Sequence, residues 1–204
     1  IAVYINNSVQ ANKAEVRELN LLNELKINLT TNVKNLDRDI STQIEGEKSI
    51  NQLLDILSNK RPYNDSIPFY LTNGIFVPDV ILTSSSFETL KSSGLEIIKS
   101  DMLRQQIINL FEVTYPYLMQ ETKRLEDQLW PAVVIPLMQK HCKNENKMWV
   151  PIDYSKLIND QEFYNMWSFR GNLRNSSTER KRGAKTKTLQ VIELIENEVE
   201  RRKK

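Results

Sequence analysis

The stretch that decides the fold is residues 19–44, LNLLNELKINLTTNVKNLDRDISTQI. Its apolar residues recur at steps of three or four positions, which places them on one face of an α-helix. The steps form a repeat of about 11 residues, or about 3.67 residues per turn, so the pattern predicts a nearly straight helix. We predict one helix from about residue 6 to 60, which Gly46 could bend and Pro62 ends. Fifty helical residues span about 75 Å, a length that suits a rod.

A second helical stretch is predicted for about residues 100–142. Apolar residues again follow the helical spacing, but three prolines lie inside the stretch, at Pro116, Pro131 and Pro136. Each proline removes a backbone hydrogen bond and clashes with the preceding turn, so we expect kinks or separate segments.

A third helix is predicted for about residues 159–202, with a loop around Gly183 as the alternative to one continuous helix. Three long amphipathic helices with shorter connections are typical of a helical bundle. We therefore expect an all-α fold, an elongated antiparallel bundle of three long helices, in one domain of residues 8–204.

Residues 61–85 differ from these stretches, because prolines, asparagines, aspartates and interleaved aromatics replace the apolar spacing. We predict an irregular loop here, then a short helix of residues 86–93 that Gly94 ends in a left-handed conformation, as a structural turn. A long loop is either functional or packed by its own side chains. Eight of its residues could line a ligand pocket or hold the loop to the helices: Tyr63, Asn64, Asp65, Phe69, Tyr70, Asn73, Phe76 and Asp79.

The composition argues against several classes of function. The chain of 204 residues has 28 Lys and Arg against 26 Asp and Glu, a net charge of +2 that is too balanced for a nucleic-acid partner. The sequence has no phosphate-binding glycine loop. One histidine, His141, and one cysteine, Cys142, make a zinc site hard to build. We therefore expect no metal, no cofactor and no enzymatic activity.

Seven basic residues gather in the predicted final helix: Arg170, Arg174, Arg180, Lys181, Arg182, Lys185 and Lys187. This basic cluster could form a surface for nucleic acid or lipid headgroups. We favour a second interpretation, a solvated helix whose charges face an acidic patch of the first helix, at Asp37, Asp39, Glu45 and Glu47.

The opening IAVYINN (1–7) resembles the pattern IAL.INN that ends the membrane-spanning helix in a group of uncharacterised envelope proteins of Bacteroidota. Two further stretches resemble the same family. LNLLNELKINLTTNVKNLDRDI (19–40) is similar to its first long helix, and SFETLKSSGLEIIKSDMLRQQIINLFEVTYPYL (86–118) to its central signature. The resemblance covers most of residues 1–142. It implies a single-pass inner-membrane protein whose basic N-terminus stays in the cytoplasm, which places this domain in the periplasm. The family has no assigned activity, so it supplies no catalytic residues.

We interpret the first five residues as the stub of an N-terminal membrane helix: Ile1, Ala2, Val3, Tyr4 and Ile5. Polar character begins at Asn6 and Asn7, as in a helix that leaves a bilayer. The expected function is then that of a membrane-tethered periplasmic domain, a scaffold, spacer or accessory subunit. Its expected partners are the inner membrane, an envelope protein or a second copy of the chain. The alternative is an extracytoplasmic sensor or ligand-binding module that uses the 61–85 region.

Overall fold

A computed structural model describes residues 2–77 and 80–202, and within them it leaves the side chains of residues 2–9, 11 and 121–126 undescribed. The fold is mostly helical, at 82% of the residues, with a small two-stranded sheet. The all-α class expected from the sequence therefore holds broadly, and the sheet is a feature that the sequence analysis did not predict.

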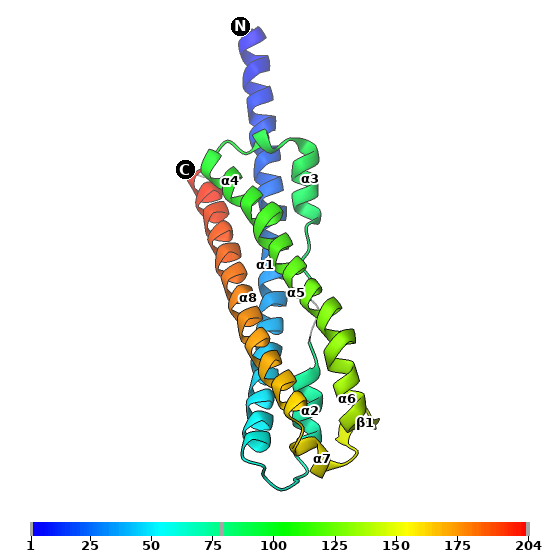
Figure 1. The fold of residues 1–204 in the computed structure, drawn as a ribbon. Helices are drawn as coiled ribbons and strands as arrows, with labels where there is room; N and C mark the ends of the chain where they lie inside the picture. Colours follow the sequence, from blue (N-terminus) through cyan, green and yellow to red (C-terminus); the bar gives the residue numbers. More distant parts are fainter. Residues whose placement is uncertain (1, 78–79, 203–204) are drawn as a thin grey trace. The chain divides into compact units, whose positions relative to one another are not determined.

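The elements follow one another along the chain as labelled in Figure 1. In order they are α1 (Ala2–Ser58), α2 (Ile67–Ile75), α3 (Ser85–Ser93), η1 (Leu95–Ile97), α4 (Asp101–Asn109), η2 (Leu110–Thr114), α5 (Tyr115–Leu129), η3 (Trp130–Val134), α6 (Ile135–His141), β1 (Cys142–Glu145), β2 (Met148–Pro151), α7 (Tyr154–Ile158) and α8 (Gln161–Arg201). Their contacts form two compact units. Unit 1 comprises Ile1–Asp37, Ile81–Tyr117 and Gly183–Lys204, and unit 2 comprises Arg38–Val80 and Leu118–Arg182.

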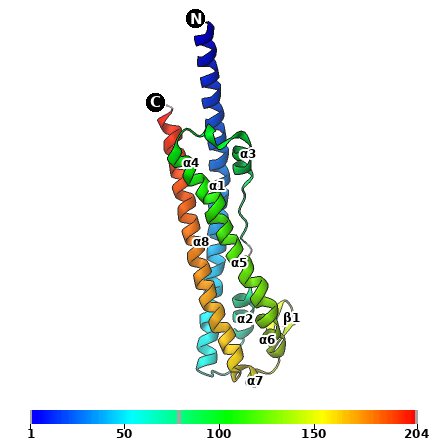
Figure 2. The ribbon, with the colours of Figure 1, turned by 45° about the horizontal axis from the view of Figure 1, so that its top comes forward.

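Unit 1 packs the first part of α1 against α3, α4 and the last part of α8 (Figure 2). The fully buried leucines of α1 include Leu22, Leu25 and Leu29, which the helical spacing keeps on one face. The same apolar cluster holds Ile195 of α8 and the stacked rings of Phe87 and Phe111, whose centroids lie 4.5 Å apart. The apolar residues that recur along α1 in the sequence therefore form part of the core of unit 1.

Three asparagines of α1 hold the extended segment that precedes α3. The side-chain amide of Asn32 donates to the Thr83 carbonyl at 2.9 Å, and its side-chain oxygen accepts from the Thr83 backbone N–H at 2.8 Å. Asn35 donates to the carbonyl of Ile81, and Asn28 to the Thr83 hydroxyl. These side chains satisfy backbone groups that a neighbouring strand would satisfy in a sheet, so the segment lies along α1 without pairing to a strand.

Gly94 ends α3 with a φ of 91° and a ψ of 119°. The φ is positive, but this ψ lies outside the left-handed helical region that the sequence analysis expected. Residues with a Cβ atom rarely adopt these angles. A Cβ here would also lie 2.3 Å from Oε1 of Glu96. The backbone N–H of Gly94 donates to the carbonyl of Lys91, so the glycine caps the helix.

The substitution Gly94→Val is expected to lower the free energy of unfolding by about 1–2 kcal/mol, because a β-branched side chain is strained at these backbone angles. Thermal unfolding followed by circular dichroism measures the change. Ser92→Val, at an exposed position of the same helix, controls for valine in a helix at ordinary angles. Equal melting temperatures for Gly94→Val and the wild type would show that this turn does not depend on glycine.

Unit 2 packs the second part of α1 against α2, α6, α7 and the first part of α8. Phe163 and Trp167 of α8 are fully buried in its apolar cluster. Gly74 allows α2 to approach this cluster, because a Cβ at position 74 would lie 2.9 Å from the Trp167 ring and 3.0 Å from Ile50. The close contact between α2 and α8 therefore depends on a glycine.

The expectation of a wholly irregular loop over residues 61–85 is wrong, because part of this region forms helix α2. The helix buries three residues at four-residue spacing, Ile67, Leu71 and Ile75. Pro68 lies in its first turn, where a missing backbone N–H costs little. Pro68, one of the prolines that indicated a loop, is thus compatible with a helix N-terminus.

The prolines of the second long stretch are accommodated by π-helical segments. α4, α5 and α6 are joined by η2 and η3, and each of these π segments ends two residues before a proline, Pro116 or Pro136. A wider turn moves the preceding carbonyl groups away from the proline ring. The chain therefore continues as a helix with local widening at these two points.

The sheet is a hairpin between α6 and α7, in which Glu145 of β1 lies opposite Met148 of β2. Asn146 and Lys147 connect the strands, and both have a positive φ, of 51° and 65°. Two consecutive residues with positive φ form the turn that suits a two-residue hairpin. The next long element, α8, is helical throughout, so Gly183 lies inside a helix rather than in a loop.

Candidate functional site

The first turns of α1 stand apart from the other elements of unit 1 (Figure 1). Gln10 and residues 12–17 are exposed, and Glu18 is the first residue of α1 described as buried. A helical segment of this length without tertiary contacts is marginal in water. This surface is therefore the first candidate for an interaction with another molecule.

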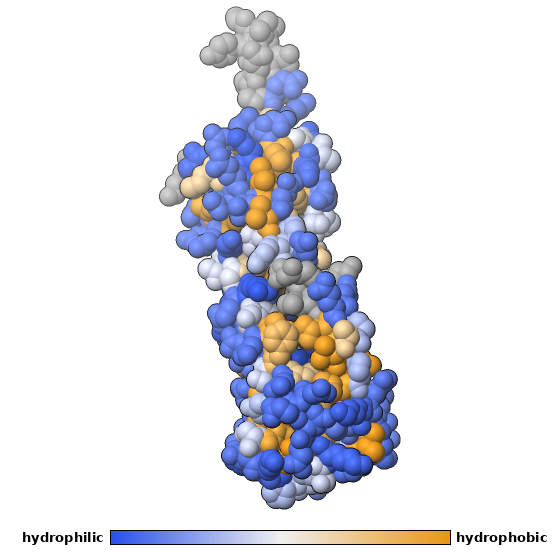
Figure 3. All heavy atoms as spheres, viewed as in Figure 1, coloured by the Kyte–Doolittle hydropathy of each residue, from blue (hydrophilic) through white to orange (hydrophobic). Residues whose placement is uncertain are grey.

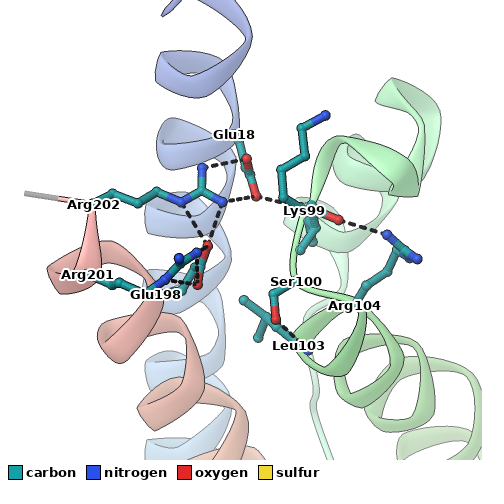
Figure 4. Close-up of polar contacts among 9 residues, drawn as sticks. Glu18, Lys99, Ser100, Leu103, Arg104, Glu198, Arg201 and Arg202 are labelled. Carbon is teal, nitrogen blue, oxygen red and sulfur yellow. Dashed lines mark hydrogen bonds and ion pairs between the residues drawn. The ribbon is translucent and has the colours of Figure 1, made fainter. Parts of the chain in front are cut away.

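A cluster of charged residues holds α1 where the other elements of unit 1 join it (Figure 4). Arg202 donates to both carboxylate oxygens of Glu18, at 2.6 and 2.9 Å, and its Nε donates to Glu198 at 2.8 Å. Glu18 also accepts the backbone N–H of Lys99, just before α4, at 2.8 Å. We call Glu18, Lys99, Glu198 and Arg202 the Glu18 cluster. It ties α1 to the start of α4 and to the end of α8.

The charges of the Glu18 cluster stabilise one another. The hydrogen bond to Glu18 raises the pKa of Arg202, while hydrogen bonds from Arg201 and then Arg202 lower the pKa of Glu198. The side chain of Glu18 is 1% exposed and that of Arg202 is 10% exposed. A pair shielded from water in this way is screened less by salt than a surface pair, so it fixes the position of α1.

A second polar centre surrounds Asp160 in unit 2, at the N-terminus of α8. Its Oδ1 accepts the backbone N–H groups of Glu162 and Phe163, at 2.8 and 3.1 Å, which makes Asp160 a helix cap. Its Oδ2 accepts from the Lys140 ammonium and from Nε2 of His141, each at 2.7 Å. The bond from Lys140, followed by those from the backbone and His141, holds the pKa of this carboxyl well below its usual range. One carboxylate therefore joins the start of α8 to the end of α6.

An aspartate that orients a histidine also occurs in acid–base catalysis. Here the histidine is 5% exposed and packs against the ring of Phe163, while Asp160 serves as a helix cap. Burial raises the pKa of the adjacent Cys142 thiol to about 12, which keeps it protonated and unreactive at neutral pH. Across the described residues, no group of three or more His, Cys, Asp and Glu could hold a metal ion. The contacts around Asp160 are those of a residue that connects two helices.

Two arginines of the basic cluster cap the C-terminus of α2. Arg170 donates to the carbonyl of Ile75 at 2.9 Å, and Arg174 donates to the carbonyls of Gly74, at 3.1 Å, and Phe76. Both arginines are buried. Guanidinium groups are favoured here because they meet free carbonyls at the negative end of the helix dipole. The interpretation of the basic cluster as a solvated face is therefore wrong for these two residues.

Gly46 of α1 makes room for Arg174. A Cβ at position 46 would lie 1.4 Å from Nη1 of Arg174 and 2.5 Å from its Cζ. Arg174 is 4% exposed and is held by the carbonyls of α2. The glycine that the sequence analysis considered as a bend is part of an α-helix, and its observed role is to leave space.

Other members of the basic cluster lie near the acidic patch, as the favoured interpretation expected, although Lys181 is buried rather than solvated. In unit 1, Lys185 of α8 pairs with Asp37 of α1 at 2.6 Å. In unit 2, Lys181 is fully buried close to Asp39; its burial lowers the pKa of the ammonium, and the Asp39 charge opposes that shift. These contacts account for several charges of both groups.

Of the eight residues selected in the 61–85 region, Asp79 lies outside the described residues. Tyr63 is 45% exposed and packs edge-on against Tyr154, with ring centroids 5.4 Å apart. Asn64 accepts the backbone N–H of Ser66 within a turn. Asp65 is exposed. These residues stabilise the start of α2 or face solvent.

The remaining four selected residues belong to α2 or follow it. Asn73 donates to the Ser49 hydroxyl at 2.8 Å and so fixes α2 to α1. Phe69 is exposed and contacts the ring of Tyr70, and Phe76 is 57% exposed. A groove of about 400 Å³ in unit 2 is lined by α1 and α8, mainly by asparagine and serine side chains, and by none of the eight selected residues.

Apolar side chains also reach the surface of both units (Figure 3). In unit 2 they include Phe69 and Phe76 at α2 and Val133 in η3, and in unit 1 they include Met102 of α4. Exposed apolar surface of this kind occurs where proteins meet partners.

Comparisons with known proteins give no relative: no protein-family model, curated protein or solved structure matches this chain. The helices of the described residues include none long and apolar enough to cross a membrane. The expected membrane stub falls outside what is described: Ile1 is not described, and for Ala2–Ile5 only the helical backbone is.

Proposed function

We propose that this chain is the extracytoplasmic domain of a bacterial inner-membrane protein, of the uncharacterised envelope family that its sequence resembles. It acts through contacts with other proteins, as a scaffold, spacer or accessory subunit, and not as an enzyme. In this proposal the long helical stretches α1, α4–α6 and α8 form the antiparallel bundle expected from the sequence.

The observation that carries the proposal is the exposed start of α1. Residues 12–17 are exposed, and a short helix without contacts is weakly stable in water. A membrane helix continuous with α1 would hold these turns in helical form. The change from apolar residues to Asn6 and Asn7 supports a chain that leaves the bilayer at this point and continues into the domain.

The Glu18 cluster supports a mechanical role. It connects α1 with the start of α4 and the end of α8 through buried, charge-assisted hydrogen bonds. A displacement of α1 along its axis would act directly on both of these elements. Such a joint suits a domain that transmits position or force from a membrane anchor.

The chemistry of the described side chains supports a role without catalysis. The Asp160 carboxylate caps α8, the guanidinium groups of Arg170 and Arg174 cap α2, and the Cys142 thiol is buried. The carboxylate and the guanidinium groups join helices, and Cys142 belongs to the apolar cluster of unit 2. The exposed apolar side chains and the free surface of α1 are the features left for partners.

Fractionation of the native, full-length gene product in its host tests the tether. The proposal expects the protein in the membrane pellet after an alkaline carbonate wash, together with a known integral membrane protein. A peripheral membrane protein serves as the control that the wash releases. Recovery of the protein with the peripheral control would overturn the proposed tether.

A further inference from the structure

The interior of unit 2 contains a polar layer where α1 meets α8. Its members are nearly or fully buried: Asp39, Gln43, Arg174, Thr178 and Lys181, of which Lys181 is 0% and Gln43 is 1% exposed. The apolar cluster of unit 2 begins at Ile50 on α1 and at Trp167 on α8, and the polar layer lies beyond it on the same two helices. Buried polar groups are normally hydrogen-bonded, so this layer requires an account of its donors and acceptors.

The contacts of the two helices place these residues at neighbouring levels of one helix pair. Arg174 lies over Gly46, Asn175 donates to Glu47, and Lys181 interacts electrostatically with Asp39. Going from Arg174 to Lys181 along α8, the contacted residues of α1 therefore run in the opposite direction, as in an antiparallel helix pair. By the same register Gln43 lies between the levels of Arg174 and Lys181.

Nζ of Lys181 and Oε1 of Gln43 are among the buried atoms of this layer that have no hydrogen-bond partner in the described structure. The Thr178 hydroxyl donates to the Arg174 carbonyl, and Nη2 of Arg174 donates to carbonyls at the end of α2. A buried polar atom left unpaired costs about 1–3 kcal/mol. One atom is a donor and the other an acceptor, and both are shielded from bulk solvent.

We propose that unit 2 encloses an internal water site between α1 and α8, in which water accepts a hydrogen bond from Lys181 and donates one to Gln43. Water fits because it offers both a lone pair and a proton. A small anion would satisfy Lys181 and be attracted by the Arg174 charge, but the Gln43 carbonyl and the Asp39 carboxylate would repel it. The inference goes beyond the proposed function and does not depend on it.

A hydrated layer of this kind has a consequence for the two helices. Internal water usually makes about three hydrogen bonds and is costly to remove. Sliding α8 by one turn along α1 would change the separation of Lys181 and Gln43 along the helix axes, so one water could no longer bridge them. The site therefore favours the observed register of α1 and α8 in unit 2.

A crystal structure at a resolution that shows ordered solvent tests the site. We expect water within about 2.7–3.2 Å of both Lys181 Nζ and Gln43 Oε1. A second crystal soaked in bromide separates the two chemistries. An anomalous bromide peak at Lys181 would show that the site binds an anion and would overturn the proposal. A dry cavity, or a direct hydrogen bond from Lys181 to Gln43, would also overturn it.

Variants provide an independent arm in solution, with water-to-protein Overhauser effects in NMR as the measurement. The double variant Gln43→Leu/Lys181→Met is expected to lose the signals of long-lived water from residues around this layer. Lys185→Met, which removes the partly exposed pair with Asp37 in unit 1, is expected to retain them. Retention of the signals in the double variant would contradict the proposed water site. If the double variant does not fold, the crystal structure of the wild type decides whether the water is present.

Discussion

The substitution Asp160→Ala is expected to lower the free energy of unfolding by about 2–3 kcal/mol. Loss of a helix cap alone costs about 0.5–2 kcal/mol. Here the change also leaves the buried His141 without its carboxylate, and hydrogen bonds to charged groups are worth more than neutral ones. For a chain of this size the melting temperature should fall by roughly 4–12 °C, which thermal unfolding by circular dichroism measures.

The matched control is Asp153→Ala. Asp153 also caps a helix, the short α7, by accepting the backbone N–H of Lys156, but its side chain is more exposed and holds no histidine. Its replacement should cost clearly less than that of Asp160. Equal losses for both variants would mean that the contacts to α6 contribute nothing.

The effect at Asp160 should also depend on pH. Because the pKa of this carboxyl is lowered in the folded state, its contribution is present above the pKa of an unfolded aspartate, about 3.9. The contribution disappears as the pH falls through the lower folded pKa. The stability difference between wild type and Asp160→Asn is therefore expected to be largest near neutral pH and to shrink below about pH 4. A difference that grows in acid would contradict this assignment.

The second large effect is expected for Gly46→Ala, with a loss of about 2–3 kcal/mol in the free energy of unfolding. In an exposed helix this change would stabilise by about 1 kcal/mol. Here the methyl group would occupy the position of the Arg174 guanidinium. Displacing that group breaks charge-assisted hydrogen bonds to the end of α2, each worth about 1.5–3 kcal/mol, so the loss exceeds the gain.

The control for this substitution is Gly183→Ala in α8, where a Cβ would meet nothing within 4 Å. It should stabilise the protein, so the two glycine substitutions should act with opposite signs in chemical unfolding. In an Arg174→Met background, Gly46→Ala should lose most of its cost. The explanation fails if both glycine variants shift stability in the same direction.

The long helices could be predicted from the sequence because their signal is local. In α1 the apolar residues at steps of three and four are the ones that are buried, such as Leu22 and Leu25. Helix α2 was missed because Pro68 and the neighbouring asparagines counted as loop signals, although proline suits a first helical turn. The same local spacing, Ile67 to Leu71 to Ile75, could have identified it.

The polar centres were harder to predict, since their partners lie far apart in sequence. Asp160 before an apolar helical run is a recognisable cap signal, but nothing local connects it with Lys140 and His141. The space that Gly46 leaves for Arg174 also depends on how α1 and α8 pack. The basic cluster shows why: one sequence pattern contains helix caps, a partly exposed ion pair and a fully buried lysine.

The central claim, a domain held on the outer side of the inner membrane by an N-terminal helix, is tested most directly by labelling in cells. A cysteine replaces Asn12, on the exposed start of α1, in the full-length protein, while the native Cys142 is buried. A membrane-impermeant maleimide is added to cells whose outer membrane alone is permeable. The account predicts labelling of the Asn12→Cys protein in these intact cells and little labelling of the wild type. Labelling that appears only after the inner membrane is broken would contradict it.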